Sequence, residues 1–233
     1  MLESELMTTK YLASIQSMQE ALLIEHQLPD ILDMKNPMTG ALGAMSINEV
    51  TQIVRRINGR CLTSATVGDL NMDATVISEA LNAMSQSQVD YLKIGLFDDP
   101  NLHDCLEALE PKLKQLPQPV IAVLFADQIS DATLVPTLAA CGFAGVMLDT
   151  AAKQGQRLTQ LWSKTALERF VLQTKQAGIL SGLAGALTFE DIAVLRPLNA
   201  DYLGFRSALC EHQQRTAALN PNRLEQLRLA LEA

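Results

Sequence analysis

Two lysines stand in or next to apolar segments that are typical of β-strands. The segment Ile31–Met34 leads directly into Lys35, and the segment that begins at Tyr91 contains Lys93. Because side chains alternate along a strand, Asp33 and Lys35 point to the same side. A lysine in a protein interior is costly to desolvate and loses affinity for its proton, so its neutral amine can attack a carbonyl carbon. The pattern therefore predicts lysine-based chemistry on a carbonyl compound.

Charged side chains after a third apolar segment add to this group. The run 145–148 is followed by Asp149, and Lys153 lies in the loop beyond it. The alternative is a set of ion pairs at a polar rim, in which Asp33 and Asp149 only neutralise the lysines. For one lysine that alternative would be preferable. Two lysines that converge with two carboxylates favour an active site.

Small residues near the end of the chain offer a place for an anion. Gly185 and Ala186 follow one apolar run, and Arg206 and Ser207 follow the last one. Small side chains let backbone N–H groups approach a phosphate, and Arg206 would add a charge-assisted contact. Ordinary packing around glycine turns is the other interpretation. A reactive lysine together with a phosphate site indicates aldol-type chemistry on triose phosphates.

The elements that position these residues alternate along the whole chain, which is typical of parallel β–α units. The predicted strands are 11–15, 31–34, 61–65, 91–94, 120–125, 145–148, 180–183 and 202–205. The predicted helices are 16–26, 48–57, 74–84, 102–116, 131–141, 165–176, 189–196 and 223–231. This pattern predicts an α/β fold, a single-domain (β/α)8 TIM barrel over residues 11–233, with residues 1–10 as an N-terminal extension.

An open, doubly wound sheet is the competing architecture. It would require a Gly-x-Gly-x-x-Gly turn after the first strand, whereas residues 14–17 are Ser-Ile-Gln-Ser. In a barrel the carboxyl ends of all strands meet at one mouth, and phosphate is often bound after the last two strands. Asp33, Lys35, Lys93 and Asp149 are therefore expected to converge there, with both lysines at the same height.

Composition limits the other functions. A net charge of −8 argues against nucleic acid or an anionic membrane surface as a partner. The four cysteines and three histidines have no metal-ligand spacing, so neither a metal site nor another cofactor is expected. The N-terminus has acidic residues where a signal peptide needs basic ones, and no apolar run has the length of a membrane helix. A cytoplasmic location is expected.

Six segments of the sequence carry a resemblance to a known family. They are DILDMKNPMTGALGA (30–44), SATVGD (64–69), DYLKIGLF (90–97), GVMLDTAAKQG (145–155), LAGAL (183–187) and DYLGFR (201–206). In this order they closely resemble the (5-formylfuran-3-yl)methyl phosphate synthases of methanofuran biosynthesis, known from methanogenic archaea and methylotrophic bacteria. The pattern D-x-K-N-P-x-x-G-x-L-G-A is the most specific of them.

The resemblance implies a reaction and a role for each site residue. The family condenses two molecules of glyceraldehyde 3-phosphate into a phosphorylated furan aldehyde, with loss of phosphate and water and without a metal. Lys35 matches its Schiff-base lysine and Lys93 its proton acceptor. Asp33, Asp149 and Lys153 match polar residues of the site. The implied enzyme class is a carbon–oxygen lyase acting on phosphates.

Two other functions remain open at this stage. Another barrel enzyme that binds phosphate, such as a class I aldolase or a ring-closing synthase, would share the lysine and the anion site. A barrel that only binds a phosphorylated metabolite would not need two lysines together. The sequence also allows a homo-oligomer, because Leu224, Leu227 and Leu231 give the last helix an apolar face that would serve either packing or an interface.

Overall fold

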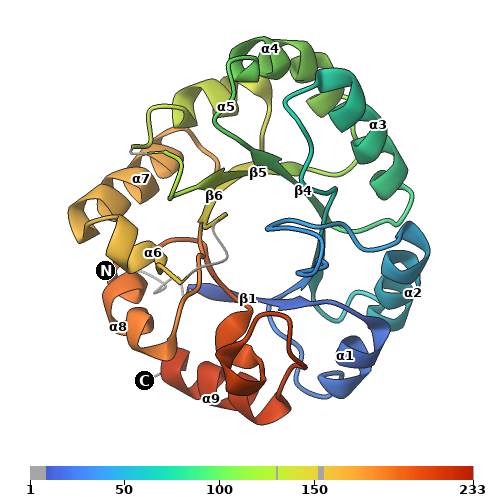
Figure 1. Ribbon diagram of the computed structural model, residues 1–233, viewed down its shortest axis with the longest axis vertical. Coiled ribbons are helices and arrows are strands. Elements are labelled where there is room, and N and C mark those ends of the chain that lie inside the picture. Colours follow the sequence, from blue (N-terminus) through green and yellow to red (C-terminus); the bar gives the residue numbers. More distant parts are fainter. Residues whose placement is uncertain (1–8, 130, 152–154, 233) are drawn as a thin grey trace, which may run out of the picture.

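Parallel strands close into a barrel in this computed structural model, which describes residues 9–129, 131–151 and 155–232. Each strand pairs with the next in chain order, and β8 pairs with β1, so the strands form a ring inside the helices (Figure 1). The strands are β1 (Lys10–Ile15), β2 (Ile31–Met34), β3 (Leu62–Thr66), β4 (Tyr91–Leu96), β5 (Val120–Phe125), β6 (Gly145–Asp149), β7 (Leu180–Leu183) and β8 (Tyr202–Phe205). The predicted (β/α)8 TIM barrel is confirmed.

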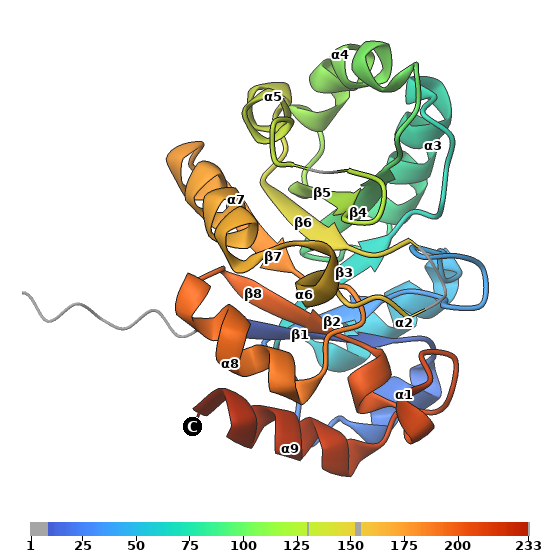
Figure 2. The same ribbon diagram turned by 60° about the vertical axis from the view of Figure 1, so that its left-hand side comes forward.

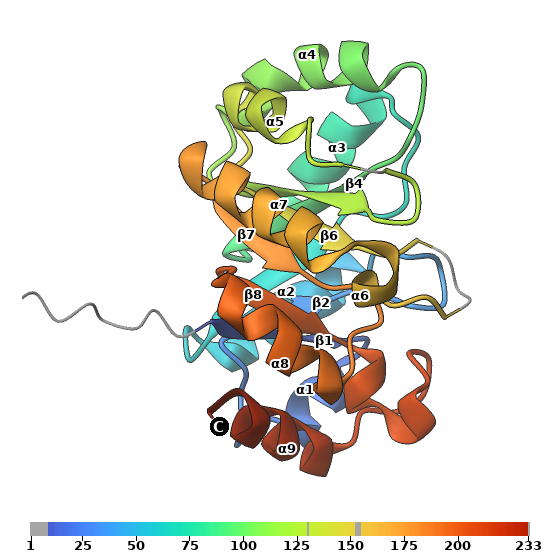
Figure 3. The same cartoon turned by 90° about the vertical axis from the view of Figure 1, so that its left-hand side faces the viewer.

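The helices form the outer layer. They are α1 (Met18–Leu23), α2 (Ile47–Ile57), α3 (Ala74–Ser85), α4 (Leu102–Leu113), α5 (Val135–Cys141), α6 (Leu158–Leu161), α7 (Lys164–Gln176), α8 (Ile192–Leu195) and α9 (Pro221–Glu232). Figure 2 shows α7, α8 and α9 following one another along one side of the barrel. In Figure 3 the strand arrows point to a common end, where the loop after β2 and the segment after β8 lie.

Local sequence signals explain where several helices begin and end. The hydroxyls of Ser46 and Ser163 accept backbone N–H groups at the starts of α2 and α7, and the carboxylate of Asp73 does so for α3. Gly142 ends α5 with a φ of 100°, a left-handed conformation that glycine adopts without a steric cost.

The bounds of several observed elements differ from the predicted ones, and four of these differences bear on the fold. β1 begins at Lys10, so the last residue of the predicted extension belongs to the barrel. Helix α5 begins at Val135 rather than at residue 131. The short helix α6 was not predicted, because four residues are too few to show a helical period. The predicted helix 189–196 is a 3-10 turn (Phe189–Asp191), then α8, then a second 3-10 turn (Arg196–Leu198) that contains a proline.

The last helix packs against the barrel. Leu224 and Leu227 are 1% and 0% exposed, and Leu231 is partly buried against the same core. The apolar face of α9 therefore packs within the chain, which was one of the two uses predicted for it. In the described part of the chain, no helix combines the length and apolar character that crossing a membrane requires.

Side chains inside the barrel lie in layers along its axis, and alternate strands contribute to each layer. Met34 of β2 pairs with Ala65 of β3, and the next residue of β3, Thr66, pairs with Lys93 of β4. Lys35, which follows Met34, is therefore in register with Lys93. The strands tilt by about 36° to the axis, which shifts successive strands by about one residue each. Two strands away from β2, Lys93 is therefore level with Asp33, one layer below Lys35.

Candidate active site

The deeper layer holds a buried ion pair. Nζ of Lys93 lies 2.6 Å from Oδ1 of Asp33, and the two side chains are 2% and 0% exposed. The hydroxyls of Ser14 and Ser64, on the strands that flank β2, donate to the two carboxylate oxygens over 2.9 and 2.7 Å. A buried charge is tolerated where it is paired and fully hydrogen-bonded. These contacts hold Asp33 and Lys93 in one orientation.

Burial and neighbouring charges change the proton affinities of both groups. Burial lowers the pKa of Lys93, and the charge of Lys35 lowers it further, while the Asp33 carboxylate opposes both effects. For Asp33, burial by itself raises the pKa, but the charges of Lys93 and Lys35 and the hydrogen bonds outweigh it and hold the pKa below its usual value. The layer therefore pairs an ionised Asp33 with a lysine that gives up its proton more readily than usual.

The layer above holds a second cation–anion pair, at the mouth. Nζ of Lys35 lies 3.6 Å from Oδ2 of Asp149, with the side chains 14% and 11% exposed. The other carboxylate oxygen of Asp149 accepts the backbone N–H of Thr150 over 2.8 Å. This pair is looser than the Lys93–Asp33 pair and remains accessible to solvent. Lys35 is thus the lysine that a molecule entering the mouth meets first.

A pocket of about 500 Å³ opens above this pair. Lys35, Asp149, Ala186 and Ser207 are among the residues that line it, and so is Arg215 from the segment after β8. Lys93 lies deeper and lines a second cavity of about 320 Å³ toward the amino ends of the strands. The expectation that both lysines lie at one height is therefore wrong, because strand tilt separates them by one layer.

The loop after β2 packs into the mouth and shapes the pocket (Figure 1). Its Leu42 is 1% exposed and belongs to the cluster inside the barrel. A Cβ on Gly95 of β4 would lie 2.9 Å from Leu42, so the missing side chain makes room for the loop. The Asp69 carboxylate accepts the backbone N–H groups of Ala41 and Leu42 over 2.7 and 2.8 Å. Asp69 therefore fixes the loop that follows Lys35.

The predicted anion turn after β7 lines the same pocket. Gly185 and Ala186 have φ values of +107° and +49°. Successive backbone N–H groups in turns of this kind can converge on an anion. A Cβ on Gly185 would lie 2.8 Å from the Thr150 methyl group, so only glycine fits there without displacement. Ser207 lies across the pocket in the turn after β8. The structure thus brings three of the four predicted anion-site residues to the pocket wall in a suitable form.

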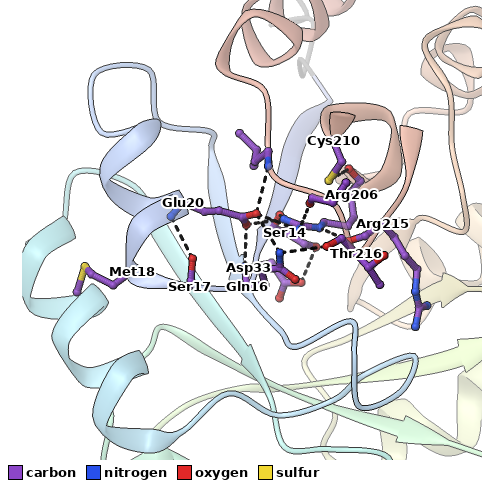
Figure 4. Close-up of polar contacts among 12 residues, drawn as sticks. Ser14, Gln16, Ser17, Met18, Glu20, Asp33, Arg206, Cys210, Arg215 and Thr216 are labelled. Atoms are coloured by element: carbon purple, nitrogen blue, oxygen red, sulfur yellow. Dashed lines mark hydrogen bonds and ion pairs between the residues drawn. The ribbon is translucent and has the colours of Figure 1, made fainter. Parts of the chain in front are cut away.

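Arg206, the fourth, has a different role. Its guanidinium donates to Glu20 over 2.6 and 3.1 Å and to the backbone oxygens of Ser14, Arg215 and Ala217 over 2.8 to 3.1 Å (Figure 4). All five N–H groups of the side chain are thus engaged by protein oxygen atoms. The prediction that Arg206 contacts phosphate is therefore wrong. The buried pair with Glu20 instead ties β8 to α1 and to the segment that follows β8.

Sequence comparison identifies the family to which this site belongs. A family model described as 4-HFC-P synthase matches residues 11–228. The chain belongs to the 4-HFC-P synthase family. A Methylorubrum extorquens protein, provisionally named (5-formylfuran-3-yl)methyl phosphate synthase, is 38% identical over 96% of this chain and 92% of its own. The Methanococcus aeolicus protein of that name is 33% identical over 79% of this chain and 83% of its own.

Solved structures with the same fold include enzymes that are named for phosphorylated compounds. 3-Hexulose-6-phosphate synthase superposes with a TM-score of 0.64 at 17% identity, covering 95% of this chain and 99% of its own. Phosphoribosyl anthranilate isomerase from Thermus thermophilus gives a TM-score of 0.62 at 14% identity, with 95% and 98% covered. At these identities the likeness concerns the fold alone.

For this 4-HFC-P synthase family member, the structure adds residues that the sequence interpretation missed. Ser14 and Ser64 hold Asp33, Asp69 holds the loop after β2, and Arg215 reaches the pocket. The two serines are polar residues at inward positions of apolar strands, which is a signal that could have found them. Lys153 lies outside the described residues. Within those residues, no group of three His, Cys, Asp or Glu side chains is placed to hold a metal ion.

Replacing Gly185 with alanine should weaken the anion site. The new Cβ would press on Thr150 and displace the turn, so we expect KM for a triose phosphate to rise about tenfold, the effect of losing one hydrogen bond to a charged group. The matched control is Gly178→Ala. Gly178 also has a positive φ, but a Cβ there meets nothing within 4 Å. Both variants should lose about 1 kcal/mol of stability from backbone strain. Equal KM values for the two would place the phosphate elsewhere.

Proposed function

We propose that this protein condenses two molecules of glyceraldehyde 3-phosphate into (5-formylfuran-3-yl)methyl phosphate. All six carbons of the substrates remain in the product, and one phosphate and two water molecules are released. Phosphate leaves by cleavage of a carbon–oxygen bond, which makes the enzyme a carbon–oxygen lyase. The same proposal places it in the cytoplasm, in the synthesis of a methanofuran-type one-carbon cofactor.

Lys35 is the nucleophile in this proposal. One aldehyde is first isomerised to dihydroxyacetone phosphate, whose ketone then condenses with the Lys35 amine and releases water. The observation that carries this assignment is that Lys35, at the wall of the 500 Å³ pocket and 3.6 Å from Asp149, is reachable by substrate, whereas Lys93 is held below it. Asp149 is placed to exchange protons with the amine as the imine forms.

Lys93 is the proton acceptor. The aldehyde group of the second triose phosphate makes its neighbouring C–H acidic, and a base within reach must remove that proton before phosphate can leave from the next carbon. Burial lowers the pKa of Lys93, which increases the neutral fraction that can accept a proton. Once protonated, the ammonium is held by the Asp33 carboxylate 2.6 Å away. The Lys93–Asp33 layer directly beneath Lys35 thus suits a base that acts on the triose phosphate bound beside the imine.

The remaining steps form the furan ring. The deprotonated triose phosphate eliminates its phosphate, and its terminal carbon then attacks the central carbon of the imine, which forms the carbon–carbon bond and turns the imine into an amine. The free hydroxyl of the dihydroxyacetone phosphate part attacks the ketone of the other part, and loss of one water and of the Lys35 amine gives the aromatic ring and frees the lysine. The imine withdraws electrons at the step where a metal ion would otherwise be required. The residues proposed for the chemistry are Lys35, Lys93, Asp33, Asp149 and Lys153.

The test is incubation of the purified protein with glyceraldehyde 3-phosphate, with furan absorbance and free phosphate read together, in the presence and absence of EDTA. Equal amounts of furan and phosphate are expected, with no effect of the chelator. A six-carbon product that keeps both phosphates would instead indicate a class I aldolase. Loss of activity with EDTA, restored by a divalent cation, would indicate a metal-dependent enzyme.

A further inference from the structure

The segment between β8 and α9 forms a closed loop over one side of the pocket. Its base is fixed by the antiparallel bridge between Cys210 and Leu219 and by hydrogen bonds from Glu211 to Ala218 and from Asn220 to Leu209. We call residues 211–218 the C-terminal loop. Residues 213–216 of this loop line the pocket above Lys35. The C-terminal loop therefore forms part of the pocket wall, and it follows the last barrel strand in the sequence.

Arg206 fixes the C-terminal loop from within. Its Nε donates to the backbone oxygen of Arg215 over 2.8 Å and its Nη2 to that of Ala217 over 3.1 Å. Glu20 neutralises Arg206 and also accepts the backbone N–H of Leu219 over 3.2 Å. In Figure 4 the Arg206 guanidinium lies within this cluster, while the Arg215 side chain extends away from it. The buried Glu20–Arg206 pair thus fixes the backbone position of Arg215.

The Arg215 side chain reaches the loop that follows Lys35. Its Nη2 donates to the backbone oxygens of Pro37 and Gly40 over 2.9 and 2.8 Å. Those two contacts use both hydrogens of Nη2. Within the described part of the chain, the N–H groups of Nε and Nη1 have no protein acceptor, and the residue lines the pocket. Arg215 therefore presents a fixed cation whose Nε and Nη1 groups can donate hydrogen bonds to a ligand.

Charge balance singles out the same residue. The described cations on the pocket wall are Lys35, Arg206 and Arg215. Lys35 is paired with Asp149, and Arg206 is paired with Glu20. Arg215 forms no salt bridge with a carboxylate of the described residues. A phosphate monoester entering a protein with a net charge of −8 needs such an uncompensated cation.

We propose that Arg215 is a phosphate-binding residue, and that the Glu20–Arg206 pair positions it. The inference rests on the proposed function, in which two phosphorylated substrates occupy the pocket together and require two anion sites. The turn at Gly185 and Ala186 supplies one of them. Arg215 supplies the other, next to the loop that follows the Schiff-base lysine, and so selects phosphorylated over unphosphorylated substrates.

The test separates phosphate binding from loop placement by means of a matched variant. Arg215→Ala removes the cation and one anchor of the loop after β2. Asp69→Ala removes another anchor of that loop, the acceptor of the Ala41 and Leu42 N–H groups, and leaves the cation in place. Arg215→Lys keeps a positive charge. Each protein is titrated calorimetrically with glycerol 3-phosphate, and borohydride trapping on Lys35 is measured with dihydroxyacetone and with dihydroxyacetone phosphate.

We expect Arg215→Ala to weaken glycerol 3-phosphate binding by about 10- to 100-fold, the usual effect of losing a hydrogen-bonded charge, and Arg215→Lys to recover part of it. Trapping of dihydroxyacetone phosphate should fall by a much larger factor in Arg215→Ala than trapping of dihydroxyacetone, which feels only the loss of the loop anchor. Unchanged glycerol 3-phosphate binding would overturn the inference. An equal loss with both ketones, as expected for Asp69→Ala, would overturn it too, in favour of a loop anchor only.

The outcome is distinguishable from failure of the proposed function. If the wild-type protein makes no furan from glyceraldehyde 3-phosphate, the proposed reaction fails, whereas the binding measurement on Arg215 still gives its own answer. If the wild-type protein makes furan and Arg215→Ala has the same KM and the same binding of glycerol 3-phosphate, only the inference about Arg215 fails.

Discussion

Replacing Lys35 with arginine should abolish both the covalent intermediate and the furan product. Borohydride added during turnover of the wild-type protein should trap a triose-phosphate-derived adduct on the peptide that contains Lys35. Arginine keeps the positive charge beside Asp149 but cannot form an imine under these conditions. Mass spectrometry of the digested protein checks the adduct, and absorbance at the furan band checks the product.

A thermal unfolding measurement on the arginine variant separates loss of the amine from loss of the fold. The Lys35–Asp149 pair is long and partly exposed, so an arginine at this position can keep the ion pair and the fold. Thermal unfolding near the wild-type temperature would show that the fold is intact. An adduct on Lys93 with Lys35 unmodified would reverse the two roles. No adduct on any lysine would exclude the Schiff-base mechanism.

The alternation of strands and helices was sufficient to predict the barrel. Short runs of four to six residues, separated by amphipathic stretches, match the eight strands closely. The prediction was weakest where an element is short or irregular. Helix α6 has four residues, and the segment after β7 is broken into three short helical pieces. In such segments, contacts with the barrel determine the structure more than local periodicity does.

The sequence interpretation identified which charged side chains converge better than how they are arranged. The period of two along a strand correctly placed Asp33 and Lys35 on the same side, which faces the barrel interior. Counting from strand ends placed Lys93 beside Lys35, because a sequence carries no direct measure of strand tilt. The tilt moves Lys93 into the Asp33 layer, so the ion pairs are Lys93–Asp33 and Lys35–Asp149.

Arg206 shows a second limit of sequence interpretation. An arginine directly after a barrel strand has the position of a phosphate ligand, and nothing near it in the sequence reveals a partner. Its partner, Glu20, lies 186 residues earlier, and the two meet only when β8 closes on β1. The same closure brings Arg215 within reach of the loop after β2, across 175 residues. Both contacts follow from the topology and not from local pattern.

Replacing Lys93 with methionine should slow proton transfer and leave imine formation in place. Methionine fills a similar volume without a base, and loss of a positioned general base costs about 10²- to 10⁴-fold in rate. We therefore expect furan production to fall by that factor, with borohydride trapping on Lys35 still detectable. Because Lys93 lies below the pocket wall, its loss should change kcat more than KM.

The single variant leaves Asp33 buried without its cation, which by itself can cost about 3–5 kcal/mol of stability. The double variant Lys93→Met/Asp33→Asn removes both charges and should recover most of that stability, but not the rate.

The single variant Asp33→Asn tests the role of Lys93 as a base through the pH dependence of kcat. Because the Asp33 carboxylate favours the protonated form of Lys93, removing it should lower the pKa of Lys93. The rise of kcat with pH, which follows deprotonation of Lys93, should then move to lower pH. A profile that does not move, or a double variant with wild-type turnover, would show that Lys93 is only a structural partner of Asp33.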